Sequence, residues 1–270
     1  MVQLLHMNNN IEEKYLKVIE DNVNVSKTGA GTEFLVTISV VAIICFCVFI
    51  FSDAIANVVI DNMSDENQVK IESALSFGNN SDFKIVNSHP EKIKLLEDYK
   101  TKIVKLDKRL QNKSPLKINE IEEKQVNAFV LPDGSIYFTS GLLDKVDNKE
   151  VLTFVLAHEL GHYAHRDHLK SIGRELLAGM ILSVLSFGNK QVGSTFNGFN
   201  NMNYINHSQK QETNADRYAN HIMYKLYGKN DGAVEFFQFL KKEEKFPELL
   251  YYFSTHPSTE KRLYIIQHSK

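Results

Sequence analysis

The longest apolar segment of the chain covers residues 34–51, eighteen positions without a charged side chain and rich in Val, Ile and Phe. Eighteen apolar residues are just enough for a helix that crosses a bilayer. The segment extends further only by including Asp53. A cleaved signal peptide is the alternative, with residues 54–56 as a weak cleavage site, but the apolar part is long and begins late. The pattern therefore predicts an uncleaved transmembrane anchor with its flank over residues 34–60.

Basic residues flank this segment unequally. Residues 1–33 are polar and Asn-rich and contain Lys14, Lys17 and Lys27, whereas Lys70 is the first basic residue that follows the segment. Cytoplasmic flanks carry the excess of Lys and Arg, so residues 1–33 are expected to form a cytoplasmic tail. The large C-terminal part of this single-pass chain is then expected outside the cytoplasm, on the periplasmic side if the chain is bacterial.

The pattern after the anchor is typical of a mainly helical α+β domain that covers residues 61–270. Residues 116–121 alternate between apolar and polar side chains, as a half-buried strand does. Residues 126–131 and 135–139 flank a Pro-Asp-Gly sequence, which predicts a hairpin turn. These segments predict a small antiparallel sheet whose strands precede the longest apolar helix of the domain.

Helical spacing of apolar residues predicts helices near residues 68–77 and from Pro90 up to the Lys-Ser-Pro sequence at 113–115. Residues 176–187 form a second apolar run, which is too short for a membrane crossing. This run predicts a buried core helix or a helix that lies on the membrane surface. Residues 188–207 are rich in Gly and Asn and predict a mobile loop, of the kind that can cover a cleft as a lid.

The composition of the chain argues against several classes of function and of metal site. The formal net charge of -2 and the pI near 6.6 give no electrostatic support for binding nucleic acid. The two cysteines, Cys45 and Cys47, both lie in the apolar segment, so the rest of the chain has no disulfide framework and no cysteine-ligated zinc site. A metal in the domain must be held by His and carboxylate side chains.

One short motif carries the chemistry. An apolar run over residues 151–157 leads directly into His158 and Glu159, and His162 follows four residues after His158. Residues four apart lie on one face of a helix, so both imidazoles can bind one metal ion, with Glu159 beside it as general base. A helix with surface histidines is the alternative, but a His and Glu cluster that emerges from a buried helix needs polar partners or a metal.

A catalytic zinc site uses three protein ligands and a water, so a third ligand is required. Glu212 and Asp216 are four residues apart at the start of a helical pattern and can face the first helix together. In this arrangement Glu212 would bind the metal, and Asp216 would orient one imidazole through its free N–H. The alternative for Glu212 is a solvated charge at a helix N-terminus.

His168 is the competing third ligand, six residues after His162, in a pattern close to that of the metzincins. That pattern needs Gly three residues after the second His, where this chain has His165. A continuous helix would point His168 away from the metal. We therefore expect His168 to lie on the surface, and His165 to lie on the surface or beside the site.

Taken together, the motifs resemble those of the HtpX and CAAX-prenyl-protease-type family of membrane-associated zinc metallopeptidases, of the gluzincin class. The matching pieces share the order and spacing of the family over roughly residues 65–268. They are Asn127-Ala128-Phe129, Pro132-Asp133-Gly134, Gly141-Leu142-Leu143, His158–His162, Arg166-Asp167, Glu212 with Asp216, His256-Pro257 and Arg262. With one clear crossing, the chain is more similar to the single-anchor or periplasmic branch than to the polytopic members.

The resemblance implies a zincin-like fold and assigns roles to several residues. It implies one Zn²⁺ per chain, with His158, His162 and Glu212 as ligands, Glu159 as catalytic base and Asp216 as an orienting partner.

The resemblance also implies that the strand at Asn127, Ala128 and Phe129 holds the backbone of the substrate. It places His256 near the cleft as a second catalytic residue, which donates to the oxyanion. A capping or packing histidine is the alternative for His256.

These observations predict a membrane-anchored zinc endopeptidase that acts on protein or peptide substrates, which in the family are misfolded or membrane-associated proteins. A membrane-anchored chaperone or scaffold with an idle or structural zinc site is the alternative, disfavoured because a closed site needs four protein ligands. A metal-dependent hydrolase of small amides is a third possibility, disfavoured by a hairpin that is suited to extended chains.

Overall fold

The structure is a computed structural model that describes residues 29–76, 83–111, 116–185, 207–243, 256 and 260–268. The chain divides into two units, residues 1–48 and 49–270, with the boundary inside the first described helix. The tail before residue 29 and nearly all of the Gly- and Asn-rich segment at 188–207 lie outside the described residues. The domain limits given above therefore stay predictions.

The apolar segment forms one continuous helix, α2 (Ala30–Asp61). Among the described residues, it is the one helix long and apolar enough to cross a membrane. Its large side chains are open: Phe34 is 62% exposed and Phe46 is 65% exposed. A row of exposed aromatic and branched side chains is unfavourable in water, so the helix has the character of a segment that is surrounded by lipid.

The helices of the second unit agree with the predicted pattern except at their ends. The predicted helix at 68–77 is α3 (Asp65–Ser76). The helix from Pro90 breaks at Asp107 into α4 (Pro90–Leu106) and α5 (Lys108–Gln111). Leu96, Ile103 and Leu110 are buried, but Leu106 is 50% exposed because it is the last residue before this break.

The sheet contains the three predicted strands, β2 (Lys117–Ile121), β3 (Ala128–Val130) and β4 (Ser135–Thr139), and a short β1 (Ile85–Val86). Their order is β1-β2-β4-β3. β3 and β4 form the expected antiparallel hairpin, whose turn is closed by Gly134 with a φ of 83°.

The prediction of a wholly antiparallel sheet is wrong, because β2 pairs with β4 in parallel, with Ile118 opposite Ile136. The chain reverses direction once before β3 and once after it, so β4 points the same way as β2 and adds to its free edge. The sheet is therefore mixed, and β3 is an edge strand.

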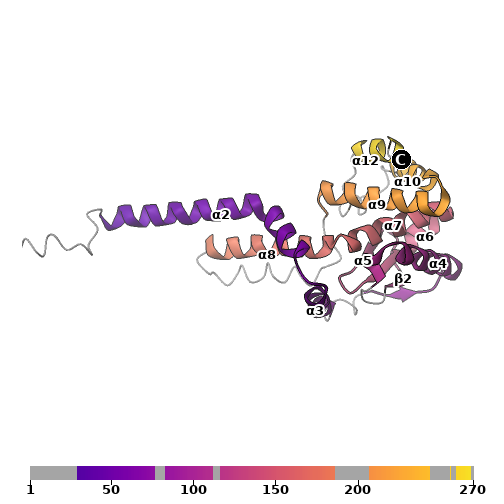
Figure 1. Ribbon diagram of the computed structural model, residues 1–270, viewed down its shortest axis with the longest axis horizontal. Helices are drawn as coiled ribbons and strands as arrows, with labels where there is room; N and C mark the ends of the chain where they lie inside the picture. The colour runs from indigo at the N-terminus through magenta and orange to yellow at the C-terminus, as the bar shows by residue number, and fades with distance from the viewer. Residues whose placement is uncertain are drawn as a thin grey trace, which may run out of the picture. The chain divides into compact units, whose positions relative to one another are not determined.

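The central element is α7 (Lys149–Ala164), in which every side chain from Val151 to Ala164 is buried. A helix that is apolar on all faces needs neighbours on all sides. α7 contacts α4, β3, α9 (Gln209–Tyr227) and α10 (Asp231–Glu243). In Figure 1, α9 and α10 lie on one side of α7 and the strands on the other.

Three further helices complete the described chain: α6 (Ser140–Lys145), α8 (Asp167–Leu185) and α12 (Glu260–His268). α8 begins well before the second apolar run and contains residues 176–185 of it, whereas residues 186–187 lie outside the described residues. Met180 is 56% exposed, so α8 is only partly covered and is not a fully buried core helix. The mainly helical α+β fold predicted from the sequence is confirmed, with these changes of detail.

Candidate metal centre

The site begins where α7 packs closely against α9. A Cβ added to Gly161 would lie 3.3 Å from the Cα of Ala215 and 3.0 Å from a ring carbon of Tyr218. A side chain at position 161 would be crowded by α9, so glycine lets the two helices pack this closely. α9 is also fixed at its start, because Ser208 and Gln211 form a reciprocal capping box. The acidic residues in the first two turns of α9 therefore face the motif on α7.

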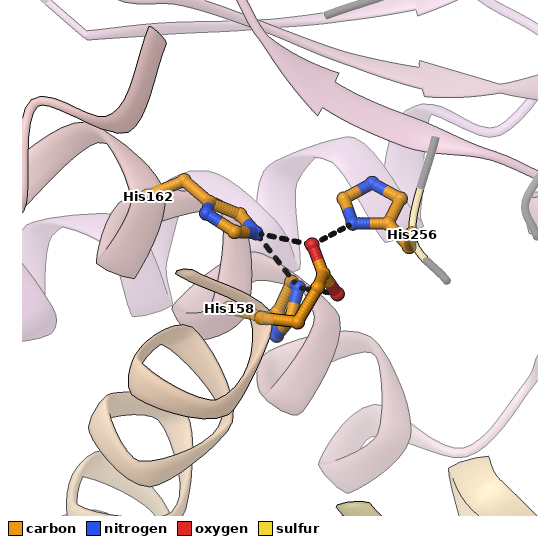
Figure 2. A group of neighbouring side chains, drawn as sticks. His158, His162 and His256 are labelled. Carbon is orange, nitrogen blue, oxygen red and sulfur yellow. Dashed lines mark hydrogen bonds and ion pairs between the residues drawn. The ribbon is translucent and has the colours of Figure 1, made fainter. Parts of the chain in front are cut away.

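His158 and His162 point the same nitrogen toward one point. Their Nε2 atoms lie 3.1 Å apart, and both side chains are almost completely buried. Glu212 comes from α9 to the same point, with Oε1 3.2 Å from Nε2 of His162 and Oε2 3.5 Å from Nε2 of His158. Figure 2 shows the imidazoles converging on this point. The structure thus brings together the three side chains that sequence reasoning selected.

The opposite nitrogen of each imidazole faces a carboxylate. Nδ1 of His158 lies 3.0 Å from Asp216, as expected from the sequence, and Nδ1 of His162 lies 2.9 Å from Asp167. Because a carboxylate only accepts, each Nδ1 keeps its proton toward its carboxylate, and Nε2 is the nitrogen of each ring that is left to bind a metal. Asp167 was not assigned this role from the sequence, although it lies only five residues after His162.

Arg262 fixes the two acidic side chains of α9. This almost fully buried guanidinium donates two hydrogen bonds to Asp216, at 2.6 and 2.8 Å, and pairs with Glu212 at 2.8 Å. Burial alone would raise the pKa of Glu212, but the charges of His256 and Arg262 outweigh it and hold that pKa well below the usual carboxyl value. Glu212 is therefore an anion, as a metal ligand must be.

The carboxylates also raise the pKa values of the two histidines on α7. Burial alone would lower the pKa of His162, but Asp167 and Glu212 outweigh it and raise the pKa to about 10. Asp216 and Glu212 raise the pKa of His158 in the same way, against the effect of burial. The potential that favours a proton on these rings also favours a divalent cation between them.

Glu159 is buried beside this group. Its Oε1 has no hydrogen-bond partner among the described residues, and it lies 3.7 Å from Nε2 of His256. Leaving a buried carboxylate oxygen unsatisfied is costly, so such an atom marks a position that a reacting water or substrate fills.

Two further histidines complete the surroundings. Nδ1 of His256 lies 3.1 Å from Oε1 of Glu212, so His256 reaches the centre from the C-terminal part of the chain, as expected. His207 stacks on the ring of His162, with centroids 3.8 Å apart and planes at 10°. Sequence reasoning missed His207, and its place directly before the α9 cap Ser208 is the only signal it gives.

The prediction that His168 lies on the surface is wrong. His168 is 1% exposed, and its Nε2 lies 3.0 Å from Oε1 of Glu72, which is also buried. The ring faces α3, a partner 96 residues away along the chain, and it is not grouped with the ligand atoms of the centre. His165 is half-buried, and burial lowers its pKa. The metzincin arrangement is therefore absent among the described residues.

The strand expected to hold substrate is β3, at the edge of the described sheet and in contact with α7. Asn127, directly before β3, is completely buried, and neither polar atom of its side chain has a hydrogen-bond partner among the described residues. Ala128 is also buried, whereas Phe129 stacks on Tyr137 of β4. Asn127 thus offers a donor and an acceptor that the described fold does not use.

The geometry of the donor atoms fits zinc. Ligands 2.0–2.1 Å from a tetrahedral zinc ion lie about 3.3 Å from one another. The Nε2 atoms of His158 and His162 lie 3.1 Å apart, and Oε1 of Glu212 lies 3.2 Å from Nε2 of His162. The 3.5 Å contact with His158 is made by the other oxygen of Glu212, Oε2. The ligand atoms of His158, His162, Glu212 and His256 all lie within 4.8 Å of one another. Two imidazoles and a carboxylate are also a donor set that zinc prefers.

A buried helix with an H-E-x-x-H motif, facing a second helix that supplies a carboxylate, defines a metallopeptidase of the zincin type. Comparison with known proteins gives the particular family. The model for peptidase family M48 matches residues 96–270, which is more than half of the chain. The chain belongs to peptidase family M48.

Three relatives illustrate the similarity. The mitochondrial metalloendopeptidase OMA1 of Schizosaccharomyces pombe is 26% identical over 169 residues, 61% of this chain and 50% of that protein. The metalloprotease LoiP of Escherichia coli is 30% identical over 168 residues, 56% of this chain and 61% of that protein. The protease HtpX of Legionella pneumophila is 39% identical over 72 residues, 25% of each chain. The chain thus spans between a quarter and about three fifths of the length of these relatives.

Proposed function

We propose that the chain is a membrane-anchored, zinc-dependent endopeptidase that hydrolyses peptide bonds in protein substrates. The observation that carries the proposal is the convergence of His158, His162 and Glu212, whose ligand atoms lie within 4.8 Å of one another, a donor set that zinc prefers. Membership of a peptidase family and the printed names of the relatives agree with this reaction.

When bound, zinc acts as a Lewis acid that polarises a carbonyl and makes water more acidic. The side chains do the rest. Glu159 accepts the proton of the attacking water and passes it to the leaving amine, for which its unpartnered Oε1 is suited. Asp216 and Asp167 hold the two imidazoles in one tautomer, so that the rings do not turn during the reaction.

The substrate is expected to lie along β3 as an added strand, with main-chain hydrogen bonds that give affinity without a strict sequence requirement. The unpartnered amide of Asn127 supports this, because a polypeptide backbone supplies the donor and the acceptor that it lacks. Ala128 and Phe129 would complete the contact. This mode suits misfolded or membrane-associated proteins, whose extended segments are accessible.

The anchor is assigned to α2, whose exposed apolar side chains support a place in lipid. The excess of Lys before the segment supports a cytoplasmic N-terminus, with the catalytic domain on the other side of the membrane. This single-pass topology places the metal centre outside the cytoplasm.

Metal removal tests the function directly. We expect the detergent-solubilised chain to cleave casein, to lose this activity when a zinc chelator is added, and to regain it with one equivalent of Zn²⁺ per chain. The matched control is Glu159→Gln, which should stay inactive throughout. Full activity in a chain shown by elemental analysis to lack metal would contradict the proposal.

Substitution of His256 distinguishes two roles for this residue, an oxyanion donor and a fourth zinc ligand. As a catalytic residue it donates to the oxyanion through Nε2 or Nδ1, and His256→Gln then lowers kcat by about 100- to 1,000-fold with unchanged zinc content. However, Nδ1 also lies 3.1 Å from Oε1 of Glu212, which is close enough for a fourth ligand. This proximity is the one observation that supports a second candidate function, in which His256 is a fourth ligand and the zinc site is closed and idle. For that candidate the same substitution raises casein cleavage and weakens zinc binding.

A further inference from the structure

The turn that connects α7 to α8 has a strained backbone at Arg166. Its φ of 59° is the one positive φ of a non-glycine residue in the described part of the chain. A residue with a side chain pays about 1–2 kcal/mol for this left-handed conformation. Such strain persists only where the surrounding contacts over-determine it. The contacts of Arg166 therefore indicate what holds the turn.

The guanidinium of Arg166 holds the end of α2. It donates to the main-chain oxygens of Ile60, at 3.0 Å, and Met63, at 2.8 Å, and to the carboxylate of Asp65, at 2.6 Å. Carbonyls at the C-terminal end of a helix lack partners within the helix, and a cation there is favourable. Arg166 is thus the cap that closes α2 and connects it to the first residue of α3.

The next residue points to the metal centre. Asp167 accepts a hydrogen bond from Nδ1 of His162 at 2.9 Å. Two consecutive residues of one strained turn therefore have different partners. Arg166 holds the end of α2, and Asp167 holds the imidazole of His162. A small rotation of this turn would move the Asp167 carboxylate away from the ring.

Two basic residues of α8 add ion pairs to this contact with α2. Lys170 and Arg174 are four apart in α8, so they lie on one face of that helix. Lys170 pairs with Asp61 at 2.8 Å and Arg174 with Asp53 at 2.6 Å. As the numbers rise along α8 they fall along α2, so the two helices run antiparallel here. A Cβ on Gly173 would meet Ala56 at 3.6 Å, so small residues let the two helices pack closely.

We propose that Arg166 is a positioning residue for the metal centre. It holds the end of α2, fixes the turn that aims Asp167 at His162, and so makes the membrane helix a structural part of the centre and not only a tether. The inference rests on the proposed function, because it takes His162 as a zinc ligand. The metal alone is the probe that tests it.

The deciding variant is Arg166→Gly, because glycine adopts the positive φ without cost and removes only the side chain. Zinc affinity is measured by competition with a chromogenic chelator on the full chain in detergent, in a Glu159→Gln background that prevents self-cleavage. Loss of a partner of a metal ligand costs 10–100-fold. We expect about a tenfold loss of zinc affinity. With Glu159 restored, kcat on casein falls and KM stays unchanged, because β3 is not affected.

Arg174→Gln is the matched control, since it breaks an ion pair of the same face two turns away from Asp167. It should change zinc affinity by less than about threefold, as expected of a partly exposed pair. Arg166→Lys keeps a cation opposite Asp65 and should recover part of the affinity.

Unchanged zinc affinity in Arg166→Gly, with only a lower melting temperature of the zinc-free chain, would show a purely structural role and overturn the inference. Equal losses of zinc affinity in Arg166→Gly and Arg174→Gln would overturn it too, since they would show a general destabilisation of the contact between α2 and α8. The proposed function fails separately, if the zinc-loaded parent chain does not cleave protein although its zinc affinity depends on Arg166.

Discussion

The Glu159→Gln chain is expected to fold, to bind one zinc ion and to lose about 1,000-fold or more in kcat on casein. A positioned general base contributes 10²–10⁴-fold to such a reaction. Gln has the size of Glu but cannot accept the proton. None of the three selected ligands is changed, and the altered oxygen has no partner among the described residues, so stability should be nearly unchanged.

The measurement combines casein cleavage with metal analysis and thermal melting of the same preparation. Arg174→Gln, which breaks an ion pair with Asp53 away from the centre, is the control and should keep a rate close to that of the parent. A Glu159→Gln chain that cleaves casein at the parental rate would exclude Glu159 as the base. One that loses its zinc would show instead that Glu159 supports the metal.

The second large effect is expected from Glu212→Gln, which removes the anionic ligand and keeps the shape of the side chain. Partners of metal ligands already contribute 10–100-fold to affinity. Loss of a ligand itself should therefore weaken zinc binding by more than about 100-fold. Proteolysis should then disappear at limiting zinc and return only in part at high zinc.

Asp216→Asn is the graded control for Glu212→Gln. It leaves the three donor atoms in place and changes the partner of Nδ1 of His158, which is also the carboxylate that Arg262 holds. Its zinc affinity should fall by about 10–100-fold, clearly less than that of Glu212→Gln. Equal affinities of the parent and Glu212→Gln chains would remove Glu212 from the ligand set.

Sequence reasoning identified the centre because its main signals are local. The two imidazoles are four residues apart on one helix, and Glu212 and Asp216 are four apart on another. Helical geometry alone places each pair on one face. The capping box at Ser208 is also local, because it joins residues 208 and 211. The contact of Gly161 with α9, which brings the two faces together, is tertiary and does not follow from the local sequence.

Partners from distant parts of the chain were harder to predict. Arg262 matched the family pattern, but its bonds to Asp216 join residues 46 positions apart. His168 was expected on the surface, because nothing near it in the sequence indicates Glu72. The role of Asp167 depends on a left-handed Arg166, a conformation that arginine rarely adopts and that no local pattern predicts.

The sheet shows the same limit. The strands and the turn at Gly134 follow from alternation and turn chemistry, which are local properties. β2 could pair with β3 or with the edge of β4 that β3 leaves free, and tertiary packing decides between the two. In the structure β2 pairs with β4, and this pairing is parallel.

The most direct test is anomalous scattering at the zinc edge from crystals of the zinc-loaded full chain. The proposed ligand set predicts one ion per chain, at about 2.0–2.2 Å from Nε2 of His158, Nε2 of His162 and a carboxylate oxygen of Glu212. An ion bound at another place, with the Glu212 carboxylate many ångströms from both imidazoles, would contradict it.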